Sequence, residues 1–263
     1  MADDVTQVQA SRDGAVLTLT LDGARIRNAI GPEVYTAITG HLSAAETDPG
    51  LRCVVITGAG GYFCAGGDIR SLKASAQGTM AQATARTDQL NAMIRAITGC
   101  PVPVIAAVEG GAAGAGLALA LACDLIVASE AAKFTMAYVK IGLSPDGGVT
   151  HFLRAALPRQ MVMDMGLRGQ PVDATRMAAF GVIAALTVSG AALGHAMTLA
   201  HDLAQGPRQA MARIKHQVNI APQNDLPTQQ ALEADGINTA RFGPEAAEGL
   251  SAFLQKRKPQ FPV

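Results

Sequence analysis

Residues 104–148 read VIAAVEGGAAGAGLALALACDLIVASEAAKFTMAYVKIGLSPDGG, and this stretch decides the fold. Its pattern predicts an apolar strand over 104–108, a turn rich in glycine and alanine, a helix of small residues and a second apolar run. A loop carrying Tyr138 and Asp146 follows. From residue 110 to residue 123 every side chain is Gly, Ala, Leu or a single thiol. The candidate functional groups in this part of the chain are therefore those of the backbone.

The turn contains Gly110, Gly111 and Gly114, and the helix is expected to begin near Ala115. The first N–H groups of a helix have no partner within it, and together with the helix dipole they favour negative charge. Glycines let a ligand approach the main chain closely. A tight turn between a strand and a helix, with small residues only for packing, would have the same pattern. This alternative stays open.

Composition restricts the classes of function. The chain has 263 residues, of which 49% are hydrophobic, and 21 basic residues balance 21 acidic ones. With a pI of about 7.0 there is no general electrostatic attraction to nucleic acid or to an anionic membrane. Aromatic residues make up 4% and Trp is absent, so platforms for base stacking are not expected. The four cysteines lack metal-ligand spacing, and we predict a reducing compartment, no disulfide framework and no metal.

Two segments bear on localisation. The N-terminal residues, MADDVTQVQASRDG, are polar and acidic and do not resemble an export signal. The apolar run over 102–128 contains Pro103, Glu109 and Asp124, so we expect a buried unit of strand, helix and strand rather than a membrane span. The sequence therefore predicts a cytoplasmic protein.

Strands and helices alternate along the first part of the chain. Strands are expected over 14–22, 51–57 and 104–108, and amphipathic helices over 32–46 and 79–98. This order predicts an α/β protein with parallel pairing, in which ligands gather at the carboxyl ends of the strands. Beyond residue 148 the chain is expected to be mainly helical, with one last strand over 182–187. Helices are predicted before this strand over 149–157, 159–167 and 173–180, and after it over 191–204, 208–219, 228–241 and 245–258.

A second glycine turn follows the strand over 51–57. Residues 63–68 read FCAGGD, and the turn over 110–116 follows the next strand along the chain. Each turn could direct one backbone N–H at a common point. Two such donors stabilise the oxygen of an enolate or of a tetrahedral intermediate. The presence of two turns, each after an apolar strand, favours a catalytic interpretation over a purely structural one.

Several segments together resemble the crotonase family, also called enoyl-CoA hydratases and isomerases. The segments are LDGARIRNAI, VVITGAGGYFCAGGDIR, PVIAAVEGGAAGAGLALALACDLIVASEAAKF, IGLSPDGG and EGLSAFLQKRKPQF. The resemblance implies a spiral of ββα units over residues 1–190 and a helical trimerisation region over 191–263, in a homotrimer or a dimer of trimers. It also implies an acyl-CoA thioester substrate, with coenzyme A as part of the substrate and no prosthetic group.

The resemblance assigns candidate site residues. The two N–H donors to the thioester oxygen fall on Gly67 and Ala115. The loop from Ala65 to Arg70 would bracket the adenine and pantetheine of coenzyme A. The candidate coenzyme A residues are Arg27, Ala65, Asp68, Ile69, Arg70, Phe253 and Lys256, the last two in some relatives supplied by a neighbouring subunit. For the basic residues of this set, a solvated surface charge is the alternative.

The chain departs from the hydratases of this family at the catalytic positions. Hydratases carry two glutamates, and the matching positions here are Ala118 and Tyr138. Asp146 matches an aspartate that several branches of the family use, among them dienoyl-CoA isomerases and chlorobenzoyl-CoA dehalogenases, and the branch that isomerises the ring epoxide of phenylacetyl-CoA is the most similar. The dehalogenase branch has a histidine where this chain has Asn91, which argues against dehalogenation. Glu109 stands where the family usually has Asn.

These features predict an acyl-CoA isomerase in which Asp146 moves one proton, and burial between Leu143 and Val149 would raise its pKa. An enoyl-CoA hydratase (a lyase of fatty-acid metabolism) and a non-catalytic acyl-CoA binding protein remain as alternatives. Asp146 could instead cap the helix that begins at Val149. Tyr138 could donate to the substrate or only pack, and packing is favoured. The acyl pocket is expected to be lined by residues 79–98, Met136, Tyr138 and the C-terminal helices.

Overall fold

The computed structural model describes residues 5–262, so the first four residues of the N-terminal segment discussed above lie outside the described residues. Nine strands lie within this range. They are β1 Gln7–Asp13, β2 Val16–Asp22, β3 Cys53–Gly58, β4 Val104–Val108, β5 Gly111–Ala113, β6 Leu125–Ser129, β7 Lys133–Thr135, β8 Val172–Asp173 and β9 Ala185–Thr187.

The main sheet has six strands in the order β1-β2-β3-β4-β6-β9. β1 pairs with β2 in an antiparallel hairpin, and all the other neighbours in this sheet are parallel. The prediction of parallel pairing in an α/β fold is therefore confirmed. β1 was not predicted because its residues, QVQASRD, lie mostly exposed at the sheet edge and contain only two apolar side chains.

Helices precede and follow the strands as the sequence pattern predicts. α1 begins with Pro32 in its first turn, and α3 begins after Thr79, which forms a reciprocal capping box with Gln82. The helices are α1 Pro32–Thr47, α2 Ile69–Ser75, α3 Met80–Gly99, α4 Ala115–Ala122, α5 Val149–Ala156, α6 Arg159–Arg168, α7 Ala174–Ala179, α8 Ala192–Ala204, α9 Arg208–Ile220, α10 Leu226–Arg241 and α11 Pro244–Leu254. Within residues 5–262 no helix is both long and apolar enough to cross a bilayer.

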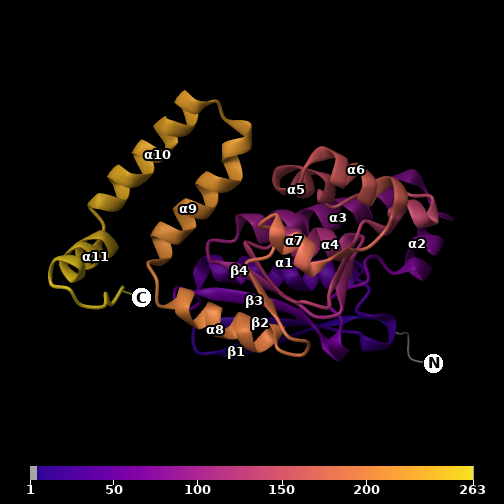
Figure 1. Ribbon diagram of the computed structural model, residues 1–263, viewed down its shortest axis with the longest axis horizontal. Coiled ribbons are helices and arrows are strands. Elements are labelled where there is room, and N and C mark those ends of the chain that lie inside the picture. Colours follow the sequence, from indigo (N-terminus) through magenta and orange to yellow (C-terminus); the bar gives the residue numbers. More distant parts are fainter. Residues whose placement is uncertain (1–4, 263) are drawn as a thin grey trace.

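Both faces of the main sheet are buried. Along β3, Val54 and Ile56 join the core beneath α1, α3 and α4, whereas Cys53 and Val55 face α8. Figure 1 shows α8 on the opposite side of the sheet from α1 and α3. The continuous apolar sequence of β3 is thus explained, because each fully buried aliphatic side chain stabilises the fold by about 1.5–3 kcal/mol.

A second sheet forms directly after β4, where the sequence predicts only a glycine and alanine turn. β5 pairs with β7 in parallel, and β7 pairs with β8. A Cβ on Gly111 would lie 2.5 Å from the carbonyl oxygen of Lys133, so the two strands approach because this residue has no side chain. β5 was missed because three small residues carry no strand pattern.

The C-terminal helices α9, α10 and α11 form an arm that extends away from the sheet (Figure 1). Lys215 of α9 fixes its base, because its Nζ donates to the Asp124 carboxylate at 2.7 Å and to the carbonyl oxygens of Ile97 and Val102. The arm carries large apolar side chains in solvent, with Phe242 89% exposed. The division at residue 190 and the trimer stay predictions.

Glu109 has a structural role at the start of α8. Its Oε1 accepts hydrogen bonds from the backbone N–H groups of Gly190 and Ala192, at 3.0 and 2.9 Å. A carboxylate at this place satisfies two donors at the beginning of the helix and complements the helix dipole. Glu109 therefore links the end of β4 to the start of α8, which gives this residue a structural role.

Candidate active site

The two glycine turns lie against each other. Cys64 and Ala112 form a parallel bridge, in which the Cys64 carbonyl accepts from the N–H of Ala113 at 3.0 Å. A Cβ on Gly66 would lie 2.7 Å from the Ala113 oxygen and 3.4 Å from the Ala115 nitrogen. Gly66 has φ +103°, a conformation that glycine adopts without strain. The absence of a side chain therefore lets the first turn reach the N-terminus of α4.

The N–H groups of Gly67 and Ala115 remain available at this contact. No hydrogen bond within residues 5–262 uses either as donor, whereas the neighbouring N–H of Asp68 donates to Ile30 and that of Gly114 to Thr135. Ala115 is the first residue of α4, so its N–H has no partner in the helix. That both groups bind one substrate oxygen stays a prediction.

Asp146 is bound by Tyr138. The Tyr138 hydroxyl donates to Asp146 Oδ1 at 2.9 Å, and the tyrosine is only 8% exposed. Tyr138 lies in a short 3₁₀ helix, Ala137–Ile141, eight residues before its partner. The expectation that its hydroxyl is satisfied is confirmed, but the sequence did not identify the carboxylate as its partner.

The alternative role for Asp146 as a helix cap is wrong. Gly148 precedes α5, and no side chain caps this helix. Only the backbone oxygen of Asp146 takes part, because it accepts from the N–H of Val149 at 3.3 Å. The carboxylate is therefore directed to Tyr138 rather than to the helix.

Burial raises the pKa of Asp146 above its usual value, and the hydrogen bond from Tyr138 partly opposes this rise. Burial and the nearby Asp146 carboxylate also raise the pKa of Tyr138, which therefore stays protonated and acts as a donor. The expected rise of the Asp146 pKa by burial is thus confirmed, although Leu143 itself is 48% exposed. Leu90 of α3, 2% exposed, lines the cavity beside Asp146 instead.

Gly147 holds the aspartate loop against α4. It has φ +59°, and a Cβ on it would lie 2.9 Å from the Cβ of Ala118 and 3.5 Å from Leu90. Ala118 is fully buried. Ala118, which stands at a position expected to carry a glutamate in hydratases, thus packs closely against the loop of Asp146.

A cavity of about 50 Å³ brings Asp146 and Gly67 together. Tyr35 of α1 and Arg86 of α3 also line it, and the sequence analysis identified neither. Tyr35 belongs to the expected helix over 32–46 and is buried beside Val34, so the pattern gave no signal beyond a core position. Arg86 donates to the backbone oxygen and the hydroxyl of Ser71, which links α3 to α2.

Of the expected walls of the acyl pocket, α3 contributes Arg86 and Leu90 to this cavity, whereas Met136 and Tyr138 do not line it. Met136 packs against α6, where a Cβ on Gly166 would lie 3.0 Å from the Met136 Cε. The C-terminal helices of the same chain do not line this cavity. Figure 1 shows their arm on the other side of the molecule from α2.

Part of the predicted coenzyme A site is assembled in one chain. The Arg27 carbonyl accepts from the N–H of Ala65 at 2.9 Å, and the Arg27 guanidinium lies 5.5 Å from the centroid of the Tyr62 ring. Asn28, which is fully buried, holds this loop by donating to the carbonyl oxygens of Ala59 and Tyr62. The sequence analysis missed Asn28, although a buried amide between two loops is a common positioning device.

The other predicted coenzyme A residues lie in three places. Asp68 caps α2 by accepting from the N–H of Arg70 at 3.1 Å, and Ile69 is 56% exposed beside them. Phe253, 82% exposed, and Lys256 lie at the end of the arm. In Figure 1 α11 and α2 are at opposite ends of the molecule, so one chain does not bring these two groups together.

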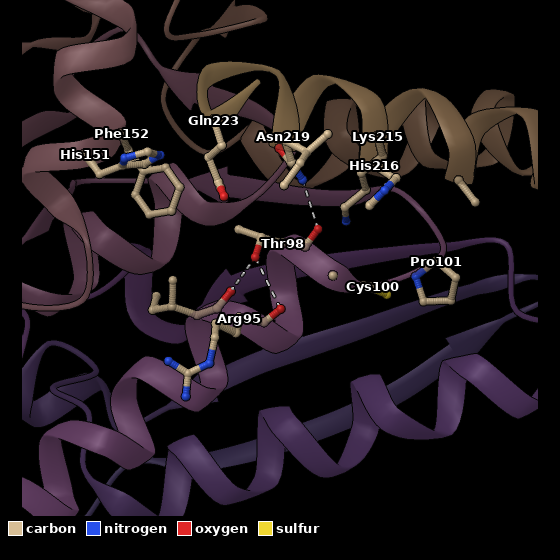
Figure 2. Close-up of a pocket in the computed structure, with 14 residues that line it drawn as sticks. Arg95, Thr98, Cys100, Pro101, His151, Phe152, Lys215, His216, Asn219 and Gln223 are labelled. Atoms are coloured by element: carbon tan, nitrogen blue, oxygen red, sulfur yellow. Dashed lines mark hydrogen bonds between the residues drawn. The ribbon is translucent and has the colours of Figure 1, made fainter. Parts of the chain in front are cut away.

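A larger cavity, of about 540 Å³, lies between α9 and the end of α3 (Figure 2). The Asn219 side chain donates to the backbone oxygen of Thr98 at 3.0 Å across it, and His151 and His216 lie on its walls. No carboxylate and none of the predicted site residues line this cavity. Its walls include the titratable side chains of His151, Lys215 and His216, and Asp146 does not line it. Within residues 5–262 no three potential metal ligands of the His, Cys, Asp and Glu types cluster.

The chain is similar to known proteins over most of its length. The chain is 36% identical to the 1,2-epoxyphenylacetyl-CoA isomerase of Escherichia coli K12 over 94% of each chain. It is 31% identical to the 2,3-dehydroadipyl-CoA hydratase of the same organism, over 98% of this chain and 99% of the relative. A crystal structure of an enoyl-CoA hydratase from Polaromonas sp. JS666 is 40% identical, with a TM-score of 0.95 over 97% of this chain and all of that one. The family model of enoyl-CoA hydratases and isomerases matches residues 11–262. With its two facing glycine turns and its crotonase fold, the chain belongs to the enoyl-CoA hydratase/isomerase family.

Proposed function

We propose that this protein is an acyl-CoA isomerase in which Asp146 removes a proton next to the thioester and returns it to another carbon. The observation that carries the proposal is that one cavity brings together the Asp146 carboxylate and Gly67, with the free N–H of Ala115 at the adjoining turn. Family membership supports the thioester substrate.

In the proposed reaction the substrate oxygen accepts from the N–H groups of Gly67 and Ala115. When the proton leaves the α-carbon, negative charge develops on this oxygen, and fixed donors stabilise it more than water would. The breaking C–H pair becomes the enolate, and Asp146 holds the proton as a carboxylic acid. Because burial raises the pKa of Asp146, this acid is closer to the range suited to proton transfer than an exposed aspartate is.

Isomerisation is favoured over hydration because one proton carrier is sufficient for it. Hydration needs one group to activate water and one to protonate carbon, and the two positions that carry glutamates in hydratases are Ala118 and Tyr138 here. The similarity to 1,2-epoxyphenylacetyl-CoA isomerase agrees with this choice. The similarity to enoyl-CoA hydratases keeps hydration as the second candidate, and a non-catalytic acyl-CoA binding protein as the third.

The coenzyme A moiety is proposed to bind along Arg27 and the loop from Ala65 to Arg70. The exposed apolar residues of the arm support a homotrimer or a dimer of trimers, in which Phe253 and Lys256 would approach the nucleotide of another subunit. In this proposal coenzyme A enters and leaves as part of the substrate, and the reaction uses no prosthetic group.

Exchange of the α-protons of phenylacetyl-CoA in D₂O tests the proposal. We expect the wild-type protein to catalyse exchange and Asp146→Asn to lose it while keeping its affinity for the thioester. A panel of 2-enoyl, 3-enoyl and ring-epoxide acyl-CoAs then separates isomerisation from water addition. Hydration that survives in Asp146→Asn would favour the hydratase, and binding without exchange or turnover in the wild type would favour the non-catalytic protein.

A further inference from the structure

Tyr35 is a second phenol beside the proposed proton carrier. It lies on α1, is 8% exposed, and lines the same cavity of about 50 Å³ as Asp146 and Gly67. Tyr138 reaches Asp146 from the 3₁₀ helix that precedes the aspartate loop. Two tyrosines from distant parts of the chain thus lie near one carboxylate.

The hydroxyl of Tyr35 has no hydrogen-bond partner within residues 5–262, in contrast to that of Tyr138. The Tyr35 hydroxyl is also not fully buried. Within residues 5–262, Arg52 Nε is the only side-chain nitrogen or oxygen that is both fully buried and without a hydrogen-bond partner. The hydroxyl is therefore accessible, and the tyrosine to which it belongs lines the cavity. Such a donor is costly to desolvate unless a ligand accepts from it.

The charged groups near Tyr35 keep it protonated. Burial and the charge of Asp146 raise its pKa well above the usual value, with smaller contributions from Cys64 and Glu33. Arg86 acts in the opposite direction but is engaged with Ser71. Tyr35 is consequently a hydrogen-bond donor and not a base.

The remaining walls of the cavity include the apolar side chains of Ile30, Leu72 and Leu90. Its volume has room for only a few water-sized groups. Asp68, Ser71, Arg86 and Thr87 are the polar residues of the wall. An acyl group that enters beside Asp146 therefore meets a mixed wall, in which the Tyr35 hydroxyl is a donor that no residue within 5–262 engages. A hydrocarbon there would leave the Tyr35 hydroxyl unpaired, whereas an oxygen substituent would satisfy it.

We propose that the Tyr35 hydroxyl binds an oxygen atom on the acyl group, next to the carbon from which Asp146 moves the proton. The preferred substrates are then acyl-CoA thioesters with an epoxide, hydroxyl or carbonyl oxygen near the reacting carbons, rather than plain alkenoyl-CoAs. This inference rests on the proposed function, because it places the acyl group beside Asp146.

The test compares two ligands of similar size, 2-hydroxyphenylacetyl-CoA and 2-methylphenylacetyl-CoA, by isothermal titration calorimetry. The hydroxyl can accept from Tyr35 and the methyl cannot. In the wild type we expect the hydroxyl compound to bind about threefold to tenfold more tightly, the range for one neutral hydrogen bond. Equal affinities in the wild type would overturn the inference without any variant.

Tyr35→Phe removes the donor and keeps the ring, so the preference should fall to about one. Thr39→Val is the matched control, because it removes a hydroxyl from the same helix that bonds only to the Tyr35 carbonyl oxygen. The control should keep the wild-type preference. An unchanged preference in folded Tyr35→Phe would refute the role of its hydroxyl.

The exchange of α-protons of phenylacetyl-CoA in the wild type separates this result from the proposed function. Exchange together with equal binding of the two ligands rejects Tyr35 as the oxygen-binding group and leaves the isomerase proposal intact. A preference for the hydroxyl compound without exchange rejects the isomerase proposal, and the oxygen-binding hydroxyl then belongs to a non-catalytic binding site.

Discussion

The hydroxyl of Tyr138 donates to Asp146 Oδ1 at 2.9 Å, so the carboxylate proposed to move the proton is held by a phenol from the preceding 3₁₀ helix. Gly147 closes the same loop against Ala118. The aspartate is thus fixed from two sides, by a hydrogen bond and by close packing. Fixed geometry of this kind lowers the cost of orienting a catalytic group.

Tyr138→Phe should move the acid limb of the pH profile to higher pH. The Tyr138 hydrogen bond stabilises ionised Asp146 and lowers its pKa, whereas burial raises it. Without the hydroxyl one of the effects that lower the Asp146 pKa is lost, so kcat/KM, which needs ionised Asp146, should begin to rise at a higher pH than in the wild type. The measurement is kcat/KM against pH for both proteins. If the acid limb of the kcat/KM profile stays in place or moves to lower pH, Asp146 is not the ionised group that this limb reports.

Asp146→Asn should reduce turnover by about 10²–10⁴-fold, the usual contribution of a general acid or base. Asn keeps the size of the side chain and an oxygen that accepts from Tyr138. Single-turnover rates with a saturating acyl-CoA measure the effect. Loss of affinity with an unchanged rate would assign Asp146 to binding instead.

The same variant should be more stable than the wild type at neutral pH. Because the folded-state pKa of Asp146 is raised, folded protein binds the proton more tightly than unfolded protein. Stability is therefore highest below the unfolded pKa and falls as pH rises through the raised folded value. Removing the buried charge should raise Tm by about 2–4 °C for each kcal/mol gained. The gain in Tm should vanish at low pH, where the aspartate is protonated in both states.

Gly147→Ala should be more harmful than Gly142→Ala. Both glycines have positive φ, +59° and +71°, so each substitution costs about 1–2 kcal/mol of backbone strain. Nothing lies within 4 Å of a Cβ on Gly142, but a Cβ on Gly147 would meet Ala118 at 2.9 Å. Overpacking adds about 1–3 kcal/mol, and displacement of Asp146 should lower kcat as well. Urea denaturation and kcat of the two variants check this, and equal losses would refute it.

Lys215→Met should loosen the base of the arm. The Lys215 and Asp124 side chains are 10% and 22% exposed, and removal of one partner leaves the other charge buried at a cost of about 3 kcal/mol. Lys133→Met is the control, because its partner Asp173 is 57% exposed and such pairs contribute at most about 1 kcal/mol. Denaturant midpoints of both variants give the comparison, and similar values would show that Lys215 is not an anchor.

The arm should join subunits in solution. Its exposed side chains include Phe242, Phe253 and Leu254, each at least 80% exposed, and such apolar surface marks an interface. Sedimentation should give three or six times the chain mass of 27.0 kDa. A monomer would contradict the predicted trimer and would leave Phe253 and Lys256 without a place in the site.

Apolar strands and glycine turns were predictable because their signals are local. The strand Val104–Val108 has the bounds that the sequence predicts, and α1 and α3 lie within one residue of their predicted ranges, 32–46 and 79–98. The short strands β5 and β7 were missed because their pairing depends on contacts across the chain. The partner of Asp146 was missed for the same reason, since eight residues and a change of direction separate it from Tyr138.

The parallel α/β architecture and the family could be predicted from the amino-acid order alone, because both follow from local patterns of residue types. The folded chain was needed to see that Asp146 is bound to Tyr138 rather than capping α5, that Glu109 anchors α8, and that Tyr35 lines the same cavity as Asp146. The physical reason is that a carboxylate or a phenol can be satisfied by many partners. Which partner it takes depends on where folding brings distant segments together.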